Sequence, residues 1–230
     1  MAKKALTFLK KDILRIPYEK NGVDHHFDEY LDEGDETKIT RLVDLPFELR
    51  TREKSDPDCC EVDQTRLQLL PYITLRDIHT GKIFVYTRGG SGDENRLHAK
   101  CSIGVGGHIE EDLTTCNSLK EIIIKNITAE LSEEVGYWTP HLQMYLNEAI
   151  EGYDYNLIYT ERDEVAKVHL CMWITLPVEL DEMGSLEKDI ITNGEWMSLD
   201  ELRNSDKFAR LEEWSAICLE QLFIEESYED

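Results

Sequence analysis

Three carboxylates stand close together near the end of the segment "GVGGHIEEDLTTCNSLKEIIIKNITAELSEEVGY", which covers residues 104–137. They are Glu130, Glu133 and Glu134. In a helix that turns by about 100° per residue, all three continue the apolar stripe that precedes them. Carboxylates on a buried stripe repel one another and lose hydration, and a divalent cation removes both costs. Oxygen-only ligands favour Mg²⁺ or Mn²⁺ over zinc. The alternative interpretation is an exposed acidic helix end.

A helix must position these carboxylates, and the sequence predicts one from Ser118 to Val135. Leu and Ile recur there with helical period. Asn117 or Ser118 is the predicted N-cap, and Gly136 is the predicted residue just after the helix. The helix would therefore end directly after the acidic cluster.

The remaining segments predict an α/β fold in which a mixed β-sheet lies between helices. "LQLLPYITLRD" and "KIFVYTRGG" predict a hairpin, and "CSIGVGGHI" predicts a short strand that ends in glycines. "LQMYLNEAI", "NLIYT" and "VAKVHLCMWITLPV" resemble strands, and "EWMSLDELRN" predicts a strand, a turn and a helix start. The apolar spacing of residues 210–225 predicts a closing amphipathic helix. Residues 20–66 read as loops around short elements.

The acidic composition opposes tight binding to nucleic-acid backbones. The 230 residues carry 25 basic and 48 acidic groups, a formal charge of -23. Phosphates of a nucleic-acid polymer would be repelled, although a small anion can bind if a cation or an Arg cluster lies between. No signal peptide or membrane-spanning run is apparent, and the six cysteines form no CxxC pair. We expect a cytoplasmic protein with reduced, mostly buried thiols.

The segment "AELSEEVGY" resembles the C-terminal part of the Nudix box, whose pattern is Gly-x5-Glu-x7-Arg-Glu-U-x-Glu-Glu-x-Gly-U, with U a bulky apolar residue. The matching residues are Glu130, Leu131, Glu133, Glu134, Gly136 and Tyr137. Upstream, "GGHIE" is similar to the glycine turn that opens the box, and "GEWMSLDEL" is similar to a segment that often follows the Nudix sheet. "RLHAKCSIGVGGHIE" and "LIYTERDEVAKVHLCMW" resemble a bacterial Nudix subgroup often labelled as predicted phosphoesterases. The resemblance covers about residues 65–205.

The chain departs from the box pattern at two points. Ala129 stands where the family has an arginine that helps to hold the glutamates, and Lys125 is a candidate replacement one turn earlier. Gly107 and Ala129 are 22 positions apart, about eight more than the pattern allows. An insertion therefore lies at the glycine turn.

The first glutamate of the box is also displaced. Glu121 fits its position by count, but Thr115, not glycine, stands six residues before it. Glu121 also lies about half a turn from Glu130 on the predicted helix. We expect an exposed pair of Glu121 with Lys125, and Glu110 or Glu111 is better placed to take over the metal role.

The resemblance implies a Mg²⁺-dependent (or Mn²⁺-dependent) hydrolase that cleaves the diphosphate linkage of a nucleoside diphosphate derivative by water attack on phosphorus. Glu130 and Glu134 would bind the ion, and Glu133 would bind it or orient a water. The Gly106 carbonyl would complete the shell, because glycine lets the backbone approach closely. These four residues are the predicted metal site, and the three glutamates are the predicted catalytic residues.

Substrate contacts are predicted mainly from cationic side chains. Arg88 and Arg96 flank the loop "RGGSGDENR", and a guanidinium matches phosphate oxygens. Exposed loop arginines are the alternative. His108 is a third substrate-binding candidate, with hydrogen bonding inside its own turn as the alternative, and His169 is predicted to be structural. Trp138 and Tyr153 either stack on a base or belong to the core. The general base is left open among Glu110, Glu111, Glu161, Asp163 and Glu164.

The resemblance also implies a domain organisation and a class of partner. Residues 1–66 form an N-terminal extension packed on the core, and residues 67–230 form the Nudix-like hydrolase domain. The expected partner is a small-molecule nucleotide, with no nucleic-acid polymer and no membrane, and a homodimer is left open. The alternative function is a catalytically impaired Nudix-like module that binds or senses a nucleotide without cleaving it.

Overall fold

The protein is described from a computed structural model covering residues 3–14, 42–89, 99–110, 116–137, 139–152, 154–179, 184, 186–187 and 190–229. The chain forms two compact units, each assembled from three stretches of sequence. Unit 1 comprises Met1–Pro71, Gly107–Asn126 and Tyr145–Met172, and unit 2 comprises Tyr72–Gly106, Ile127–Met144 and Trp173–Asp230. Arg96, Glu111, Trp138 and Tyr153 lie outside the described residues.

In unit 1, strand β1 (Lys4–Leu9) pairs antiparallel with β2 (Phe47–Thr51) and with the beginning of β3 (Arg66–Asp77). Its central residues are fully buried, so this N-terminal strand contributes to the core. Short helical turns α1 (Lys10–Ile13) and η2 (Leu42–Asp44) flank the strands. Residues before position 66 thus supply strands to the sheet, and the division at 66/67 remains a prediction.

Helix α3 (Leu119–Glu134) confirms the predicted carrier of the carboxylates. Its first turn is capped by Ser118, whose Oγ accepts the Glu121 N–H at 3.2 Å. The Glu121 carboxylate in turn accepts the Asn117 N–H at 2.8 Å. Gly136 follows the helix with φ of 61°, the left-handed conformation that glycine adopts without strain.

The predicted strand over "LQMYLNEAI" is wrong, because these residues belong to helix α4 (Leu142–Gly152). The buried residues Leu142, Leu146, Ala149 and Ile150 recur at i, i+4, i+7 and i+8, which is the apolar face of a helix. The run also contains only one β-branched residue, Ile150. Its strand-like appearance came from its short length and apolar content, which do not separate the two structures.

Two of the predicted strands that follow α4 are confirmed. They are β6 (Asn156–Ile158) and β7 (His169–Val178), with the short turn η5 (Ala166–Val168) between them. Strand β7 pairs with β3 and β6. It is buried along most of its length, as its nearly continuous apolar sequence indicates.

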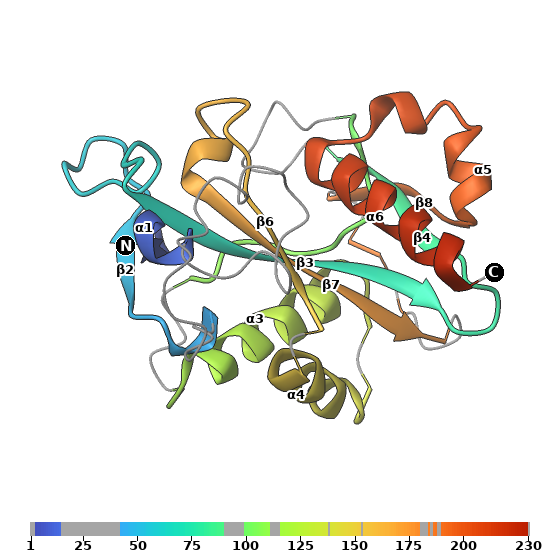
Figure 1. The fold of residues 1–230 in the computed structure, drawn as a ribbon, viewed down its shortest axis with the longest axis horizontal. Coiled ribbons are helices and arrows are strands. Elements are labelled where there is room, and N and C mark those ends of the chain that lie inside the picture. Colours follow the sequence, from blue (N-terminus) through green and yellow to red (C-terminus); the bar gives the residue numbers. More distant parts are fainter. Residues whose placement is uncertain are drawn as a thin grey trace. The chain divides into compact units, whose positions relative to one another are not determined.

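In unit 2, β3 and β4 (Ile83–Arg88) pair antiparallel through Arg76 and Ile83, which confirms the predicted hairpin. Strand β4 also pairs with β5 (Cys101–Ser102) and β8 (Ile191–Met197). Ser198 and Glu201 form a capping box at the start of α5 (Leu199–Arg203). After η7 (Phe208–Arg210), α6 (Glu213–Glu229) is the predicted closing helix, and α5 contacts both β8 and α6 (Figure 1).

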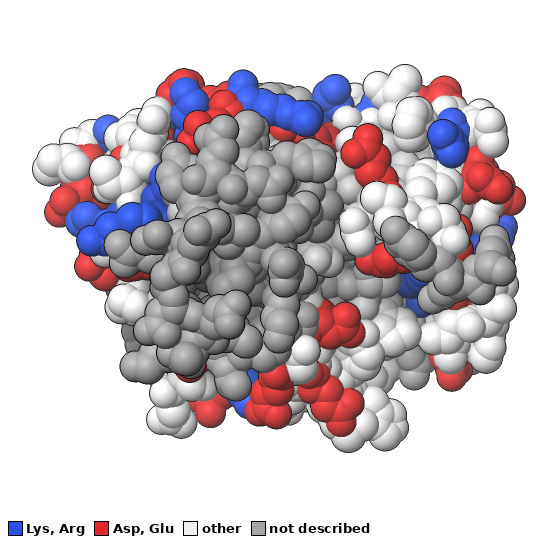
Figure 2. Space-filling model, viewed as in Figure 1, with Lys and Arg blue, Asp and Glu red and all other residues white. Residues whose placement is uncertain are grey.

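The predicted α/β class with a mixed sheet is confirmed, since the strands form one eight-stranded sheet. All six cysteines are free, and five are buried, as predicted for reduced thiols. No helix among the described residues is both long and apolar enough to cross a membrane. On the face drawn in Figure 2, Asp and Glu side chains spread over the described surface between groups of basic ones.

Candidate active site

The three glutamates at the end of α3 differ in their exposure to solvent. Glu134 is buried, with 8% of its surface exposed, whereas Glu130 is partly buried and Glu133 is exposed. The predicted burial is therefore right for Glu134 and wrong for Glu133. Glu133 has the helical phase of a buried residue, but it lies in the last turn, where its side chain reaches solvent.

The surroundings of Glu134 destabilise the ionised form of its carboxylate. Among the described residues, its Oε2 is buried and has no hydrogen-bond partner. Burial, followed by the charge of Glu130, raises the pKa of Glu134 to about 8, and Glu187 and Glu133 act in the same direction. Its backbone carbonyl accepts the Glu187 N–H at 2.8 Å, which keeps that further acid close by. A cation at this carboxylate would remove the cost.

Arg88 supplies positive charge to the same region. It is the last residue of β4, and its charge opposes the effects that raise the pKa of Glu134. Its guanidinium Nη1 lies 3.9 Å from the Glu212 carboxylate, and only 24% of its side chain is exposed. Arg88 thus pairs with a buried protein carboxylate, and its predicted contact with phosphate remains a prediction.

Glu212 is a buried carboxylate that the sequence reading missed. The Tyr72 hydroxyl donates to its Oε1 at 2.7 Å, and Ser102 and Ser215 donate to the same oxygen at 2.5 and 3.4 Å. These bonds compensate for the lost hydration of the carboxylate and fix it beside Arg88. The partners lie between 3 and 140 positions away in sequence, so no local pattern could have identified them.

The glycine turn before α3 begins in this polar network. The Gly104 carbonyl accepts the Tyr86 hydroxyl at 2.8 Å and lies 3.0 Å from the Ser102 Oγ, whose hydrogen is directed to Glu212. A Cβ at Gly104 would lie 2.1 Å from the Tyr72 ring, so only glycine fits there. Gly106, two residues further on, is partly buried, and its role as a metal ligand remains a prediction.

Several other predicted residues have structural surroundings of their own. Lys125 and Ala129 are exposed on α3, and Glu121 is an exposed capping residue whose carboxylate bonds to the Asn117 N–H. The expected side-chain pair of Glu121 with Lys125 is thus replaced by a backbone contact of Glu121. That Glu121 has no metal role remains a prediction.

Most of the candidate general bases in unit 1 make hydrogen bonds or ion pairs with other protein groups. Glu161 accepts from Lys10 and from the Tyr159 hydroxyl, both at 2.6 Å. Asp163 accepts the N–H groups of Val165 and Ala166, and Glu164 pairs with Gln64 and Lys167. Glu110 is exposed. These contacts hold loops of unit 1, and the general base stays unassigned.

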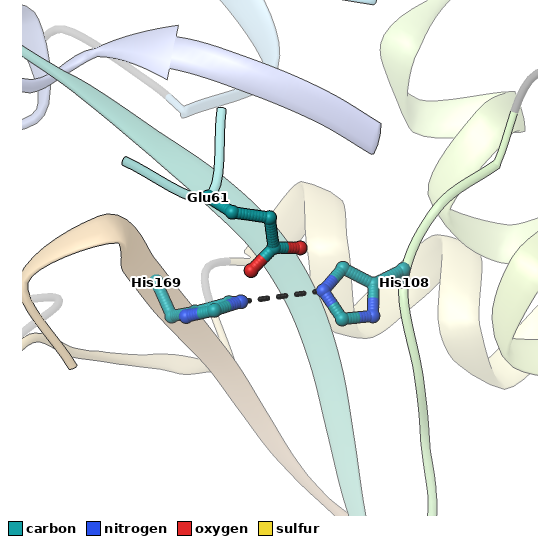
Figure 3. Close-up of side chains that lie close together, drawn as sticks. All are labelled: Glu61, His108 and His169. Atoms are coloured by element: carbon teal, nitrogen blue, oxygen red, sulfur yellow. Dashed lines mark hydrogen bonds between the residues drawn. The ribbon is translucent and has the colours of Figure 1, made fainter. Parts of the chain in front are cut away.

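His108 and His169 form a second cluster, together with Glu61, inside unit 1 (Figure 3). The two Nε2 atoms are 3.2 Å apart. Burial, and then the charges of Arg52, His169 and Lys3, lower the pKa of His108 well below its ordinary value, so its ring is neutral. His108 thus contacts another ring outside its own turn, and its predicted contact with substrate remains a prediction.

Comparison with known proteins identifies the fold. No protein-family model matches the chain. Protein YmaB of Bacillus subtilis is 29% identical over 189 residues, which cover 82% of this chain and 86% of YmaB. The crystal structure of Tm1382, described as a candidate Nudix hydrolase, matches with a TM-score of 0.60 and 22% identity, over 95% of this chain and 97% of that one. This structural similarity, together with the α/β architecture, shows that the chain has the Nudix hydrolase fold.

Proposed function

We propose that the chain is a Mg²⁺-dependent Nudix-type hydrolase that cleaves the diphosphate linkage of a nucleoside diphosphate derivative by attack of water on phosphorus. The observation that carries this proposal is the buried Oε2 of Glu134, which has no hydrogen-bond partner among the described residues. It lies at the position where the box resemblance expects a metal ligand. In this chain the motif lies at the end of helix α3, and the chain has the Nudix hydrolase fold.

The residues present fit a hard divalent cation. Glu134 and the partly buried Glu130 stand four residues apart on one helix, a spacing that puts both side chains on the same face. All the proposed ligands are oxygen atoms, with Glu133 and the Gly106 carbonyl completing the set, which favours Mg²⁺ or Mn²⁺. When bound, such an ion would neutralise the diphosphate, polarise phosphorus and activate water.

The protein residues would divide the remaining work by their surroundings. Glu133 is exposed and can hold and orient a water molecule. Arg88 is proposed as a positioning residue for Glu134, because its charge favours the ionised form of that carboxylate and because Glu212 fixes its guanidinium. This role would compensate for Ala129, which is exposed and lacks the charge of the box arginine.

The proposed partner is a small-molecule nucleotide in the cytoplasm. The net charge of -23 opposes binding of polyanions, so a small substrate would depend on a bound cation to approach the acidic cluster. Arg88 adds positive charge beside this cluster. A homodimer is compatible with this proposal and is not required by it.

The test is turnover of a nucleotide panel with and without Mg²⁺. ADP-ribose, NADH, dinucleoside polyphosphates and nucleoside triphosphates should be incubated with the protein, and the products read by phosphate release and mass spectrometry. We expect at least one substrate to be cleaved at its diphosphate linkage, with activity abolished by EDTA and restored by Mg²⁺. Nucleotide binding without turnover would instead support the alternative function, a module that senses a nucleotide. If the protein neither cleaves nor binds any nucleotide of the panel, both proposals are contradicted.

A further inference from the structure

Glu61, His108 and His169 bring three potential metal ligands together from separate parts of unit 1. Glu61 lies in the turn before β3, His108 follows the glycine turn, and His169 begins β7. One ligand atom from each residue lies within 4.8 Å of the others. His169 is buried, and the other two are partly buried. Figure 3 shows the three side chains close together. The proposed hydrolase function uses none of them.

The spacing of the two imidazoles matches that of ligands on a single ion. Nitrogens that each lie about 2.0–2.1 Å from a tetrahedral Zn²⁺ are roughly 3.3–3.4 Å apart. The Nε2 atoms of His108 and His169 are 3.2 Å apart. A small adjustment of either ring would therefore bring both lone pairs onto one ion.

The ring of His169 is oriented for this task. Its Nδ1 is 2.7 Å from the Val165 carbonyl, which can only accept, so Nδ1 carries the hydrogen. The lone pair of neutral His169 is then on Nε2 and is directed toward His108. A ligating histidine almost always donates its other N–H to a carbonyl, a carboxylate or water, which fixes its tautomer in this way.

His108 and Glu61 are also held in place by their neighbours. The His108 carbonyl accepts from Asn126 Nδ2 at 3.2 Å, and the next residue, Ile109, accepts the Leu6 N–H at 3.0 Å. Glu61 Oε1 accepts from Arg52 Nε at 2.7 Å, which orients its carboxylate. Hydrogen-bonded carboxylates of this kind are common at metal sites.

We propose that Glu61, His108 and His169 form a transition-metal site, separate from the glutamate cluster of α3, that binds Zn²⁺ or a similar first-row ion. Two imidazoles and one carboxylate suit zinc or iron, whereas Mg²⁺ prefers oxygen ligands alone. Without an ion, His108 Nε2–H donates to His169 Nε2. Binding moves that hydrogen to His108 Nδ1 and frees Nε2 as a ligand. Three protein ligands leave at least one coordination position open.

The test is a Zn²⁺ titration of the full chain in excess Mg²⁺, so that the glutamate cluster is occupied by its preferred ion. Calorimetry and metal analysis after dialysis should give one tightly bound zinc per chain and a raised melting temperature. His108→Ala and Glu61→Gln should each weaken zinc binding by more than about 10-fold. Loss of an outer-shell partner already costs about 10-fold, and loss of a direct ligand should cost more. His141→Ala is the matched control, because His141 is exposed and outside the cluster.

Two results would overturn this proposal. One is a wild-type chain that retains no stoichiometric zinc after dialysis. The other is unchanged affinity in both Glu61→Gln and His108→Ala, which would mean that zinc binds elsewhere. Because His108 is half-buried, circular dichroism should confirm that His108→Ala is folded. If that variant is unfolded, the zinc affinity of Glu61→Gln, an isosteric change, tests the proposal.

Discussion

Glu134→Gln should lower turnover by about 100-fold or more, a loss typical for removal of a charge-stabilising group, whereas Glu121→Gln should keep it within a few-fold. Both variants make the same chemical change on helix α3. Glu134 is the buried carboxylate with an unpartnered oxygen, and Glu121 is an exposed capping residue. Glutamine preserves the cap at position 121, because its amide oxygen can also accept a backbone N–H.

The measurement is kcat and KM at saturating Mg²⁺ on the best substrate of the panel. Similar losses in the two variants would mean that Glu121 belongs to the metal site and that the box glutamates follow the standard spacing by count. Melting temperatures should accompany the kinetics. Glu134→Gln replaces a buried carboxyl whose ionised form has unfavourable neighbours, so we expect the metal-free variant to be at least as stable as the metal-free wild type.

Arg88→Met should reduce activity by roughly 10- to 100-fold, the usual range for a lost outer-shell partner of a metal site. Methionine keeps an unbranched apolar stem like that of arginine and removes the charge that acts on Glu134 and pairs with Glu212. Lys125→Ala is the matched control. Lys125 is exposed on α3, so its replacement should change neither turnover nor the Mg²⁺ requirement.

A double-mutant cycle tests whether Arg88 acts through Glu134. If Arg88 acts through Glu134, the Arg88→Met change should add little to the loss already caused by Glu134→Gln. Additive losses would mean that Arg88 acts elsewhere, for example on substrate phosphate. If Lys125→Ala loses most of its turnover and Arg88→Met keeps it, the role of the missing box arginine belongs to Lys125.

Much of the fold could be predicted because its signals are local. Helix α3 was predicted within a residue at each end, since a cap, an apolar period and a terminal glycine all lie inside the segment. Helix α4 was missed for the opposite reason. Its short apolar run was compatible with a strand or a helix. The packing of Leu142, Leu146 and Ile150 in the folded chain selects the helix.

The candidate sites were predictable only in part. The box motif is contiguous, so it led directly to Glu130 and Glu134 as candidate ligands. Glu212 depends on contacts with residues up to 140 positions away, and Glu61 meets His108 and His169 only after folding. Helical phase also failed for Glu133, because phase describes the direction of a side chain and not whether another element covers it.

The central claim is that Glu130 and Glu134 share one divalent cation, and a crystal structure with Mn²⁺ tests it most directly. Mn²⁺ prefers the same oxygen ligands as Mg²⁺ and scatters anomalously, so its position can be assigned without ambiguity. We predict an anomalous peak in contact with carboxylate oxygens of both residues, including the buried Oε2 of Glu134. Glu130 and Glu134 side chains that point apart, with no anomalous density between them, would contradict the account.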